Sequence, residues 1–250
     1  MRLQSRNMPF LFAHRGGMAH AQENSEAAFS FALESGIGGL ESDVRLTADG
    51  VPVLAHDGYY RKGILRQNIS KKTRHSLSSS IMSLGDLYDR FGCDFELSLD
   101  IKVPEAAAAA VTVASEAEQQ AGRPALSRLW LCHPDWELLA SWREQWESVK
   151  LVNSVPLSRL TDGPERRCAQ LAKATIDALN FPHPDWNAGL VTLAHRFDVL
   201  AFAWDAHHER IIKELLQMGV DGIYGNHVDR LLRVSENFRL FQTSKTQSSS

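Results

Sequence analysis

The sequence has 250 residues, 44% of them hydrophobic and 23% charged, and a formal net charge of −3. A chain of this length can bury one large core, and its slight acidity gives no general attraction to nucleic acid or anionic membranes, so we expect neither as a partner. No stretch approaches the roughly 18 apolar residues of a membrane span, and three scattered cysteines do not predict a disulfide framework, so we expect a cytoplasmic protein.

Short strand-like segments alternate with longer helical patterns along nearly the whole chain. The strand candidates are residues 9–14, 39–46, 51–56, 95–102, 128–133, 150–155, 177–182, 199–204 and 221–226. The helical patterns occupy residues 25–36, 84–92, 104–122, 135–147, 165–175 and 207–219. Such alternation predicts parallel strands that are joined by right-handed helical crossovers.

The candidate strands number one more than a TIM (β/α)₈ barrel contains. The four residues 47–50 are too few for a parallel crossover, so the segments on either side of them must form an antiparallel hairpin. The remaining eight strands predict a closed TIM barrel, with the hairpin as an excursion from its rim. An open doubly wound sheet is the alternative architecture.

The hairpin also predicts a position for one histidine. A two-residue turn at 49–50 places His56 opposite Asp43, and a four-residue loop at 47–50 places it opposite Glu41. In both registers His56 returns to a pair of acidic residues on the preceding strand.

A single domain is expected over residues 1–240. Within it, residues 57–83 are polar and weakly periodic, which predicts a loop or small insertion at the rim that carries the hairpin. Residues 241–250 have a low-complexity composition, which predicts a disordered tail. Nothing in the sequence specifies an oligomeric state.

Charged residues collect at the carboxyl ends of the predicted strands, and in a barrel these ends share one face. The residues at these ends are His14, Arg15, Glu41, Asp43, Asp100 and Lys102. A folding core gains nothing from such a concentration of charge. The pattern therefore predicts that this face carries an active site.

The acidic residues of this group predict a metal site. Glu41 and Asp43 are two residues apart, so their side chains point to the same side of a strand. Two neighbouring carboxylates repel each other unless a cation lies between them, and oxygen ligands favour Mg²⁺ or Ca²⁺. Asp100 can supply a third oxygen. The alternative is that Glu41 and Asp43 belong to a solvated strand face.

The remaining residues of the group suit a phosphodiester. His14 and His56 can each change charge near neutral pH, as a general acid and a general base require. Arg15 presents a fork that matches phosphate oxygens, and Lys102 presents a point charge. For His56 alone, a structural hydrogen bond is the simpler interpretation. Trp204 ends a later strand, where it either fills the barrel core or stacks against a substrate.

Several segments form a recognisable set of motifs. They are "AHRG" at 13–16, "EN" at 23–24, "LESDVRLTADGVPVLAHD" at 40–57, "FELSLDIK" at 95–102, "AFAWD" at 201–205 and "MGVDGIYGN" at 218–226. Together they resemble the glycerophosphodiester phosphodiesterases, whose pattern is HRG, PENT, E-x-D, HD, E-x-K, W-T-x-N and GVDGIITD. The resemblance spans residues 9–232 and is most specific in its first fifty residues.

The resemblance implies a TIM-barrel enzyme of lipid and glycerol metabolism that cleaves glycerophosphodiesters to an alcohol and glycerol 3-phosphate. In such enzymes a substrate hydroxyl next to the phosphate attacks first, and water opens the resulting cyclic phosphate. The site residues that it implies are the divalent-metal ligands Glu41, Asp43 and Asp100, the proton carriers His14 and His56, and the phosphate partners Arg15 and Lys102.

The chain departs from the family pattern at a few positions. Asp100 stands in place of the family's Glu, which shortens the carboxylate by about 1.5 Å. Residues 224–226 replace I-T-D, and Gln22 replaces the Pro of PENT. Two other functions stay open at this point. One is a lyase of the sphingomyelinase D type that leaves a cyclic phosphate, and the other is a non-catalytic phosphate-binding barrel.

Overall fold

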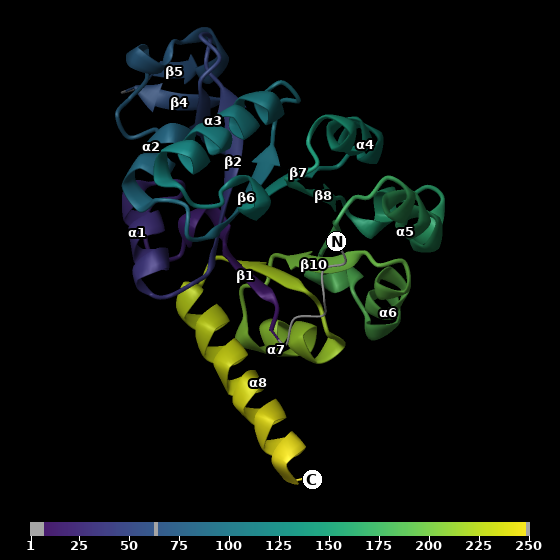
Figure 1. Cartoon of the computed structure of the whole chain (residues 1–250). Helices are drawn as coiled ribbons and strands as arrows, with labels where there is room; N and C mark the ends of the chain where they lie inside the picture. The colour runs from purple at the N-terminus through teal and green to yellow at the C-terminus, as the bar shows by residue number, and fades with distance from the viewer. Residues whose placement is uncertain (1–7, 63–64, 249–250) are drawn as a thin grey trace.

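Eight parallel strands pair edge to edge, and the sheet closes because β1 bonds both β2 and β11. The computed structural model, shown in Figure 1, describes residues 8–62 and 65–248. The barrel strands are β1 (Phe10–Ala13), β2 (Gly39–Leu46), β6 (Glu96–Ile101), β7 (Leu129–His133), β8 (Lys150–Ser154), β9 (Ala178–Pro182), β10 (Leu200–Trp204) and β11 (Gly222–Gly225). The predicted TIM barrel is confirmed, and the open sheet is excluded.

Helices lie on the outside of the barrel, where all but the last connect successive strands and the last, α8, follows β11 (Figure 1). They are α1 (Glu26–Glu34), α2 (Leu84–Phe91), α3 (Ala106–Ala121), α4 (Trp136–Gln145), α5 (Gly163–Lys173), α6 (Ala188–Arg196), α7 (Glu209–Met218) and α8 (Val228–Ser248). Side-chain caps start several of them: Asp135 accepts the first amides of α4, and Asn187 caps α6. The sequence patterns predicted six of these helices and missed α6 and α8.

The hairpin between β2 and β3 (Pro52–Leu54) has a register that the sequence did not predict. Leu46 pairs with Pro52 and Val44 with Leu54, so the connecting loop has one residue more than the longer of the two predicted loops. Thr47 closes this loop, because its hydroxyl accepts the amide of Val51 at 2.9 Å. Both predicted registers are therefore wrong by one residue.

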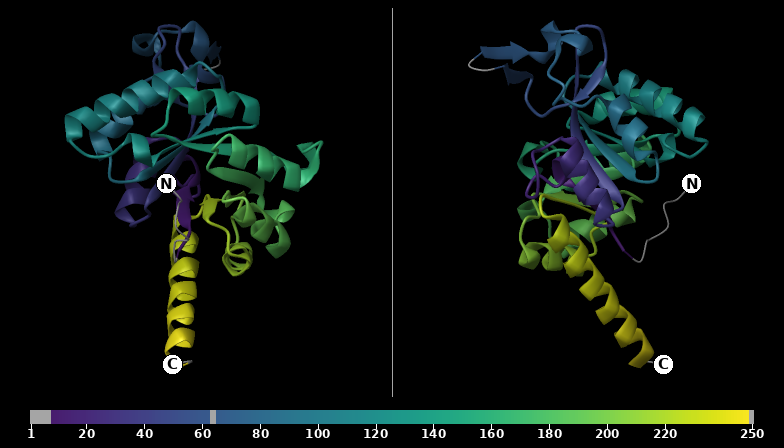
Figure 2. Two further views of the ribbon diagram at one scale, coloured as in Figure 1. Left: turned by 45° about the vertical axis from the view of Figure 1, so that its right-hand side comes forward. Right: turned by 90° about the vertical axis from the view of Figure 1, so that its left-hand side faces the viewer.

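The rim insertion that follows β3 is confirmed and has structure of its own. Its strands β4 (Tyr59–Lys62) and β5 (Leu65–Asn68) form a separate antiparallel pair that projects from the barrel (Figures 1 and 2). Residues 63–64 between these strands lie outside the described residues. Further along the insertion, Ile69 and Leu77 pack with Val53 in a small apolar cluster, which holds the insertion on the hairpin.

The C-terminal end of the chain differs from the predicted disordered tail. Helix α8 continues to Ser248, and its later turns extend away from the barrel (Figures 1 and 2). The packed first turns supply the helix nucleus, and each further residue then joins without a new nucleation cost. Leu240 and Phe241 are accordingly exposed on this projecting part. Residues 249–250 lie outside the described residues.

Aromatic side chains fill the interior of the barrel below its mouth. Phe12 stacks on Tyr224 with ring centroids 4.7 Å apart, and both rings are buried with Trp130 and Phe202. In β-strands alternate residues face the same side, so the residues two positions further along these strands point into the mouth of the barrel. Among the described helices, none has both the length and the apolar character that a bilayer crossing requires.

Candidate active site

His14 and Arg15 leave β1 in a short 3₁₀ turn, His14–Gly16, at the carboxyl end of the barrel. Arg15 has φ 50° and ψ 39°, a left-handed conformation that is uncommon for a residue with a side chain. Its amide donates to Glu41 Oε2 at 2.8 Å, and its carbonyl accepts from the amide of Asn24 at 2.9 Å. The unusual backbone is therefore held from both sides, as is typical of functional sites.

His14 lies between an amide and a carboxylate. Its Nδ1 is 2.6 Å from Asn226 Oδ1, and its Nε2 is 3.8 Å from Glu41 Oε2. Because an amide oxygen only accepts hydrogen bonds, Nδ1 carries the proton in the neutral ring and Nε2 has a free lone pair. Burial lowers the pKa of His14, against the hydrogen bond to Asn226, so the neutral form is favoured.

Two carboxylates of β2 form the buried centre of the site. Glu41 is 6% exposed and Asp43 is 2% exposed. Burial and the charge of Asp43 raise the pKa of Glu41 well above its ordinary value. Asp43 Oδ2 is buried and receives no hydrogen bond from the described residues, although Arg15 Nε lies 3.2 Å from it.

Lys102 bridges two acidic residues from adjacent strands. Its Nζ is 2.9 Å from Asp43 Oδ1 and 2.6 Å from Asp100 Oδ2. The parallel register pairs Asp43 directly with Asp100, which explains why one ammonium reaches both. Burial opposes the charge of Lys102, but these two carboxylates outweigh burial and raise its pKa.

Arg15 completes this network of charges. Its Nη1 donates to Glu23 Oε2 at 2.6 Å, on the loop that precedes α1. Burial opposes the guanidinium charge, but the hydrogen bond to Glu23 and the nearby Asp43 and Glu41 carboxylates raise the pKa of Arg15. The structure thus brings six of the predicted residues into one continuous group: His14, Arg15, Glu41, Asp43, Asp100 and Lys102.

His56 lies beside this group but does not contact it through its ring in the described structure. The slipped hairpin register sets the amide of Ala55 against the Asp43 carbonyl at 2.9 Å, and His56 follows. Its Nδ1 is 3.1 Å from Asp57 Oδ1, and Arg45 donates twice to its carbonyl, at 2.9 and 2.7 Å. The backbone of His56 is anchored next to the acidic pair, while its half-exposed imidazole lies on the rim against Asp57.

Unpaired polar atoms mark a second part of the barrel mouth. Trp204 ends β10 and packs against the interior aromatic cluster, and its buried Nε1 has no hydrogen-bond partner within residues 8–62 and 65–248. Asn180 of β9 is 5% exposed, and its buried Oδ1 has no partner in the part of the chain that the structure describes, while its Nδ2 donates to Ser154 Oγ at 3.0 Å. Buried polar groups are normally paired, so these two atoms are available to a bound molecule.

The acidic residues have the chemistry of a site for a hard divalent cation. Glu41 and Asp43 offer only oxygen, Glu41 resists ionisation when no cation compensates its burial, and Asp43 Oδ2 has the Arg15 ion pair but no hydrogen bond from the described residues. The Lys102 ammonium already compensates the other oxygen of Asp43 and the carboxylate of Asp100. These residues therefore fit a metal ion.

Some residues of the site depart from the family pattern in the sequence or belong to no motif in it. Asn226 lies 212 positions from its partner His14, and Asn180 and Ser154 belong to strand ends without charge. The alternation of side chains along a strand could have indicated Asn180, because it lies two residues after the interior Ala178 and therefore on the same face of β9.

A closed (β/α)₈ barrel whose mouth gathers cations and carboxylates beside a partly buried histidine defines a barrel protein with a site for phosphorylated ligands. The model of the Glycerophosphoryl diester phosphodiesterase family matches residues 14–230. The chain belongs to this family.

Known proteins show how far the similarity extends. Glycerophosphodiester phosphodiesterase 1 of Bos taurus is 47% identical over 55 residues, which are 22% of this chain and only 17% of that protein. A glycerophosphodiester phosphodiesterase of Bacillus altitudinis is 24% identical over 93% of this chain and 100% of its own length. An Oleispira antarctica phosphodiesterase, solved in complex with the product sn-glycerol-3-phosphate, has a TM-score of 0.75 at 20% identity, over 91% of this chain and 96% of that chain.

Proposed function

We propose that this chain hydrolyses glycerophosphodiesters to an alcohol and glycerol 3-phosphate with the help of a divalent metal ion, Mg²⁺ or Ca²⁺. The observation that carries the proposal is the continuous group of charges from His14 to Asp100 at the barrel mouth. Membership of the family and the product complex of the Oleispira antarctica phosphodiesterase support the same substrate class.

The cations of the site are placed to bind the phosphate. Arg15 and Lys102 flank Asp43 and can turn their remaining donors toward phosphate oxygens. Glu41, Asp43 and Asp100 would hold the metal ion. When bound, the ion supplies positive charge that offsets the charge on the phosphoryl oxygens as the bond breaks. Lys102 can then shift its contacts from the carboxylates to the phosphate.

The two histidines divide the proton transfers. Burial favours the neutral form of His14, whose Nε2 has a free lone pair, so it is the group that takes a proton from the attacking hydroxyl of the substrate or from water. His56 can offer a proton from its rim position to the oxygen of the departing alcohol. Direct attack by water adds one water across the phosphorus–oxygen bond in a single step. If the substrate hydroxyl attacks first, the alcohol leaves with a proton from His56, and the two histidines then exchange roles as water opens the cyclic phosphate.

The unpaired atoms of Trp204 and Asn180 suit the uncharged part of the substrate. Trp204 offers an N–H donor and Asn180 an acceptor, a pair that hydroxyl groups can satisfy together. We therefore place the hydroxyl-bearing portion of the substrate against β9 and β10, opposite the acidic residues on β2 and β6.

The free and buried state of all three cysteines, Cys93, Cys132 and Cys168, supports a reducing location for the enzyme. On this basis we place it in the cytoplasm, where it would serve lipid and glycerol metabolism.

The decisive experiment follows the product with several glycerophosphodiesters, with Mg²⁺ or Ca²⁺ and with a chelator. We expect metal-dependent release of glycerol 3-phosphate that is lost in His14→Ala and His56→Ala. His195→Ala, which changes a histidine paired to Asp221 at the far end of the barrel, serves as the matched control. A cyclic phosphate that persists would instead identify a lyase, and binding without turnover would identify a phosphate-binding barrel. Activity in both site variants would contradict the assignment of the histidines.

A further inference from the structure

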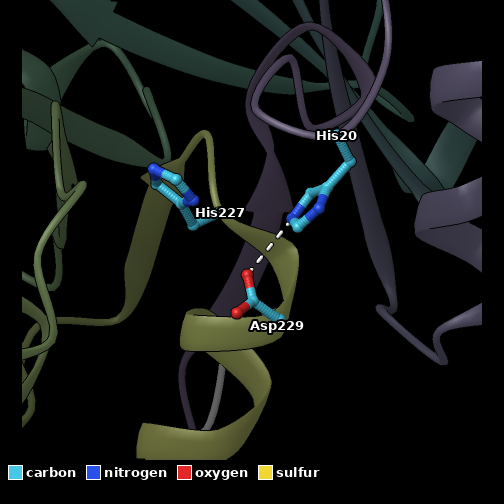
Figure 3. A group of neighbouring side chains, drawn as sticks. All are labelled: His20, His227 and Asp229. Atoms are coloured by element: carbon cyan, nitrogen blue, oxygen red, sulfur yellow. Dashed lines mark ion pairs between the residues drawn. The ribbon is translucent and has the colours of Figure 1, made fainter.

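A second cluster of metal-ligating side chains lies outside the site described above. Within residues 8–62 and 65–248, one set of three histidine, cysteine or carboxylate groups has ligand atoms that all lie within 4.8 Å of one another. This set is His20, His227 and Asp229, which we call the His20 cluster. Figure 3 shows the three side chains, with His20 on the loop after β1 and the other two at the start of α8.

The geometry of the His20 cluster is close to that of a coordination site. His20 Nε2 is 3.1 Å from Asp229 Oδ1, and the rings of His20 and His227 lie 6.0 Å apart at 85°. Zinc bonds of about 2.0–2.1 Å in tetrahedral geometry place neighbouring ligand atoms about 3.3 Å apart. One edge of such a tetrahedron is therefore already present between His20 and Asp229.

The two segments that carry the cluster are fixed against each other. The Ala19 amide donates to the Asn226 carbonyl at 3.3 Å, and His20 stacks on Phe31 with centroids 4.3 Å apart. The chain also approaches closely at Gly17, where a Cβ atom would lie 2.7 Å from Val228 Cγ2. The backbone on both sides of the cluster is thus held in place before any ligand binds.

We propose that the His20 cluster binds a divalent transition-metal ion of the zinc class. Two imidazoles and one carboxylate are ligands that suit Zn²⁺, whereas Mg²⁺ and Ca²⁺ prefer oxygen alone. Asp229 is 48% exposed, so solvent can fill the remaining coordination position.

An ion at this position would cross-link the loop after β1 to the start of α8. This loop begins directly after the turn that carries His14, and α8 begins two residues after Asn226, the hydrogen-bond partner of His14. The ion would therefore stabilise both segments that position the proposed base. The inference concerns metal binding alone and does not depend on the hydrolytic function proposed above.

The competing interpretation is an ordinary ion pair between His20 and Asp229 that His227 merely adjoins. The two interpretations differ in what they predict for His227. A metal site needs the second imidazole, whereas an ion pair binds no metal with or without it.

The test uses Co²⁺ as a spectroscopic substitute for Zn²⁺ on the full chain, with excess Mg²⁺ present to occupy the oxygen site. Cobalt absorbs visible light strongly in four-coordinate sites, and added Zn²⁺ should remove the signal. The variants are His227→Ala and Asp229→Asn. His75→Ala changes an exposed histidine of the rim insertion and is the matched control.

We expect one equivalent of Co²⁺ on the unaltered chain and on the His75→Ala control. In the two cluster variants affinity should fall by more than the roughly 10–100-fold that the loss of an outer-shell partner costs. Zn²⁺ should also raise the melting temperature of the unaltered chain but not that of His227→Ala. Equal Co²⁺ affinity in the chain and both variants, or no four-coordinate signal at all, would overturn the proposal. Asp229→Asn changes an exposed side chain and should fold, so it can still test the proposal if His227→Ala does not fold.

Discussion

The contact between His14 and Asn226 allows a test of how the proposed base is oriented. Asn226→Leu keeps a side chain of similar size but removes the oxygen that lies 2.6 Å from His14 Nδ1. The largely buried Nδ1–H of His14 then has no hydrogen-bond acceptor in its present position. An unsatisfied buried donor costs about 1–3 kcal/mol, so we expect the free energy of unfolding to fall by about that amount.

The same change should slow the reaction. Without the Asn226 oxygen, the His14 ring can rotate or carry its proton on Nε2, where it can no longer act as a base. If losing the hydrogen bond raises the activation free energy by the same 1–3 kcal/mol, kcat falls about 5- to 150-fold, because about 1.4 kcal/mol corresponds to a factor of ten in rate. We expect KM to change little, because the ring does not bind the ground state of the substrate in this mechanism.

Steady-state release of glycerol 3-phosphate measures kcat and KM, and urea unfolding measures the stability. Asn226→Asp is the matched control, because it retains an acceptor for Nδ1. Its negative charge favours the imidazolium, so the acidic limb of the pH–rate profile should move to higher pH. An unchanged kcat in Asn226→Leu, while His14→Ala is inactive, would refute the argument that Asn226 orients the base.

Three further changes test the electrostatics and the packing. Glu41→Gln should abolish metal-dependent activity yet stabilise the metal-free chain. Burial raises the pKa of Glu41 in the folded state above the unfolded value of 4.5. The protein therefore becomes less stable as pH rises from 4.5 toward the folded pKa, because only the unfolded chain then loses the proton freely. The stability advantage of Glu41→Gln in urea with a chelator should therefore grow with pH, and a constant difference would contradict this. The hydrogen bond to Asp221 raises the pKa of His195 above its ordinary value of 6.5. The pair therefore stabilises the fold fully below pH 6.5, and this stabilisation is lost as pH rises through the folded pKa. For this half-exposed pair, His195→Gln should cost less than about 1 kcal/mol, and only at low pH. Gly39→Ala should lower the free energy of unfolding by about 1–3 kcal/mol or more, because the new Cβ would lie 2.6 Å from the Leu11 carbonyl oxygen, and unchanged thermal unfolding would contradict this.

The barrel could be predicted from the sequence because the alternation of strands and helices admits few architectures. The charged residues at the ends of three strands then had to share one rim, and six of them do lie in one group. His56 was harder to place, because its position depends on a hairpin register that a single residue can change. Thr47 closes a loop one residue longer than expected, and this slip moves His56 past the position opposite Asp43.

The C-terminal tail and the neutral polar residues of the site could not be predicted from the sequence for a different reason. The composition after residue 240 has no pattern of its own, but α8 continues through it because a packed helix precedes it. Asn180 has no charge and no motif to single it out. Its importance appears only in the structure, where its buried oxygen has no partner among the described residues.

The sequence by itself determined the closed barrel and the face on which its charges collect, because strand periodicity and parallel connections act locally and repeat along the chain. Only the tertiary structure decided which atoms meet: Lys102 between Asp43 and Asp100, and Asn226 against His14 from 212 positions away. Such contacts depend on barrel closure and on side-chain reach within about 3 Å, and no spacing along a strand specifies them.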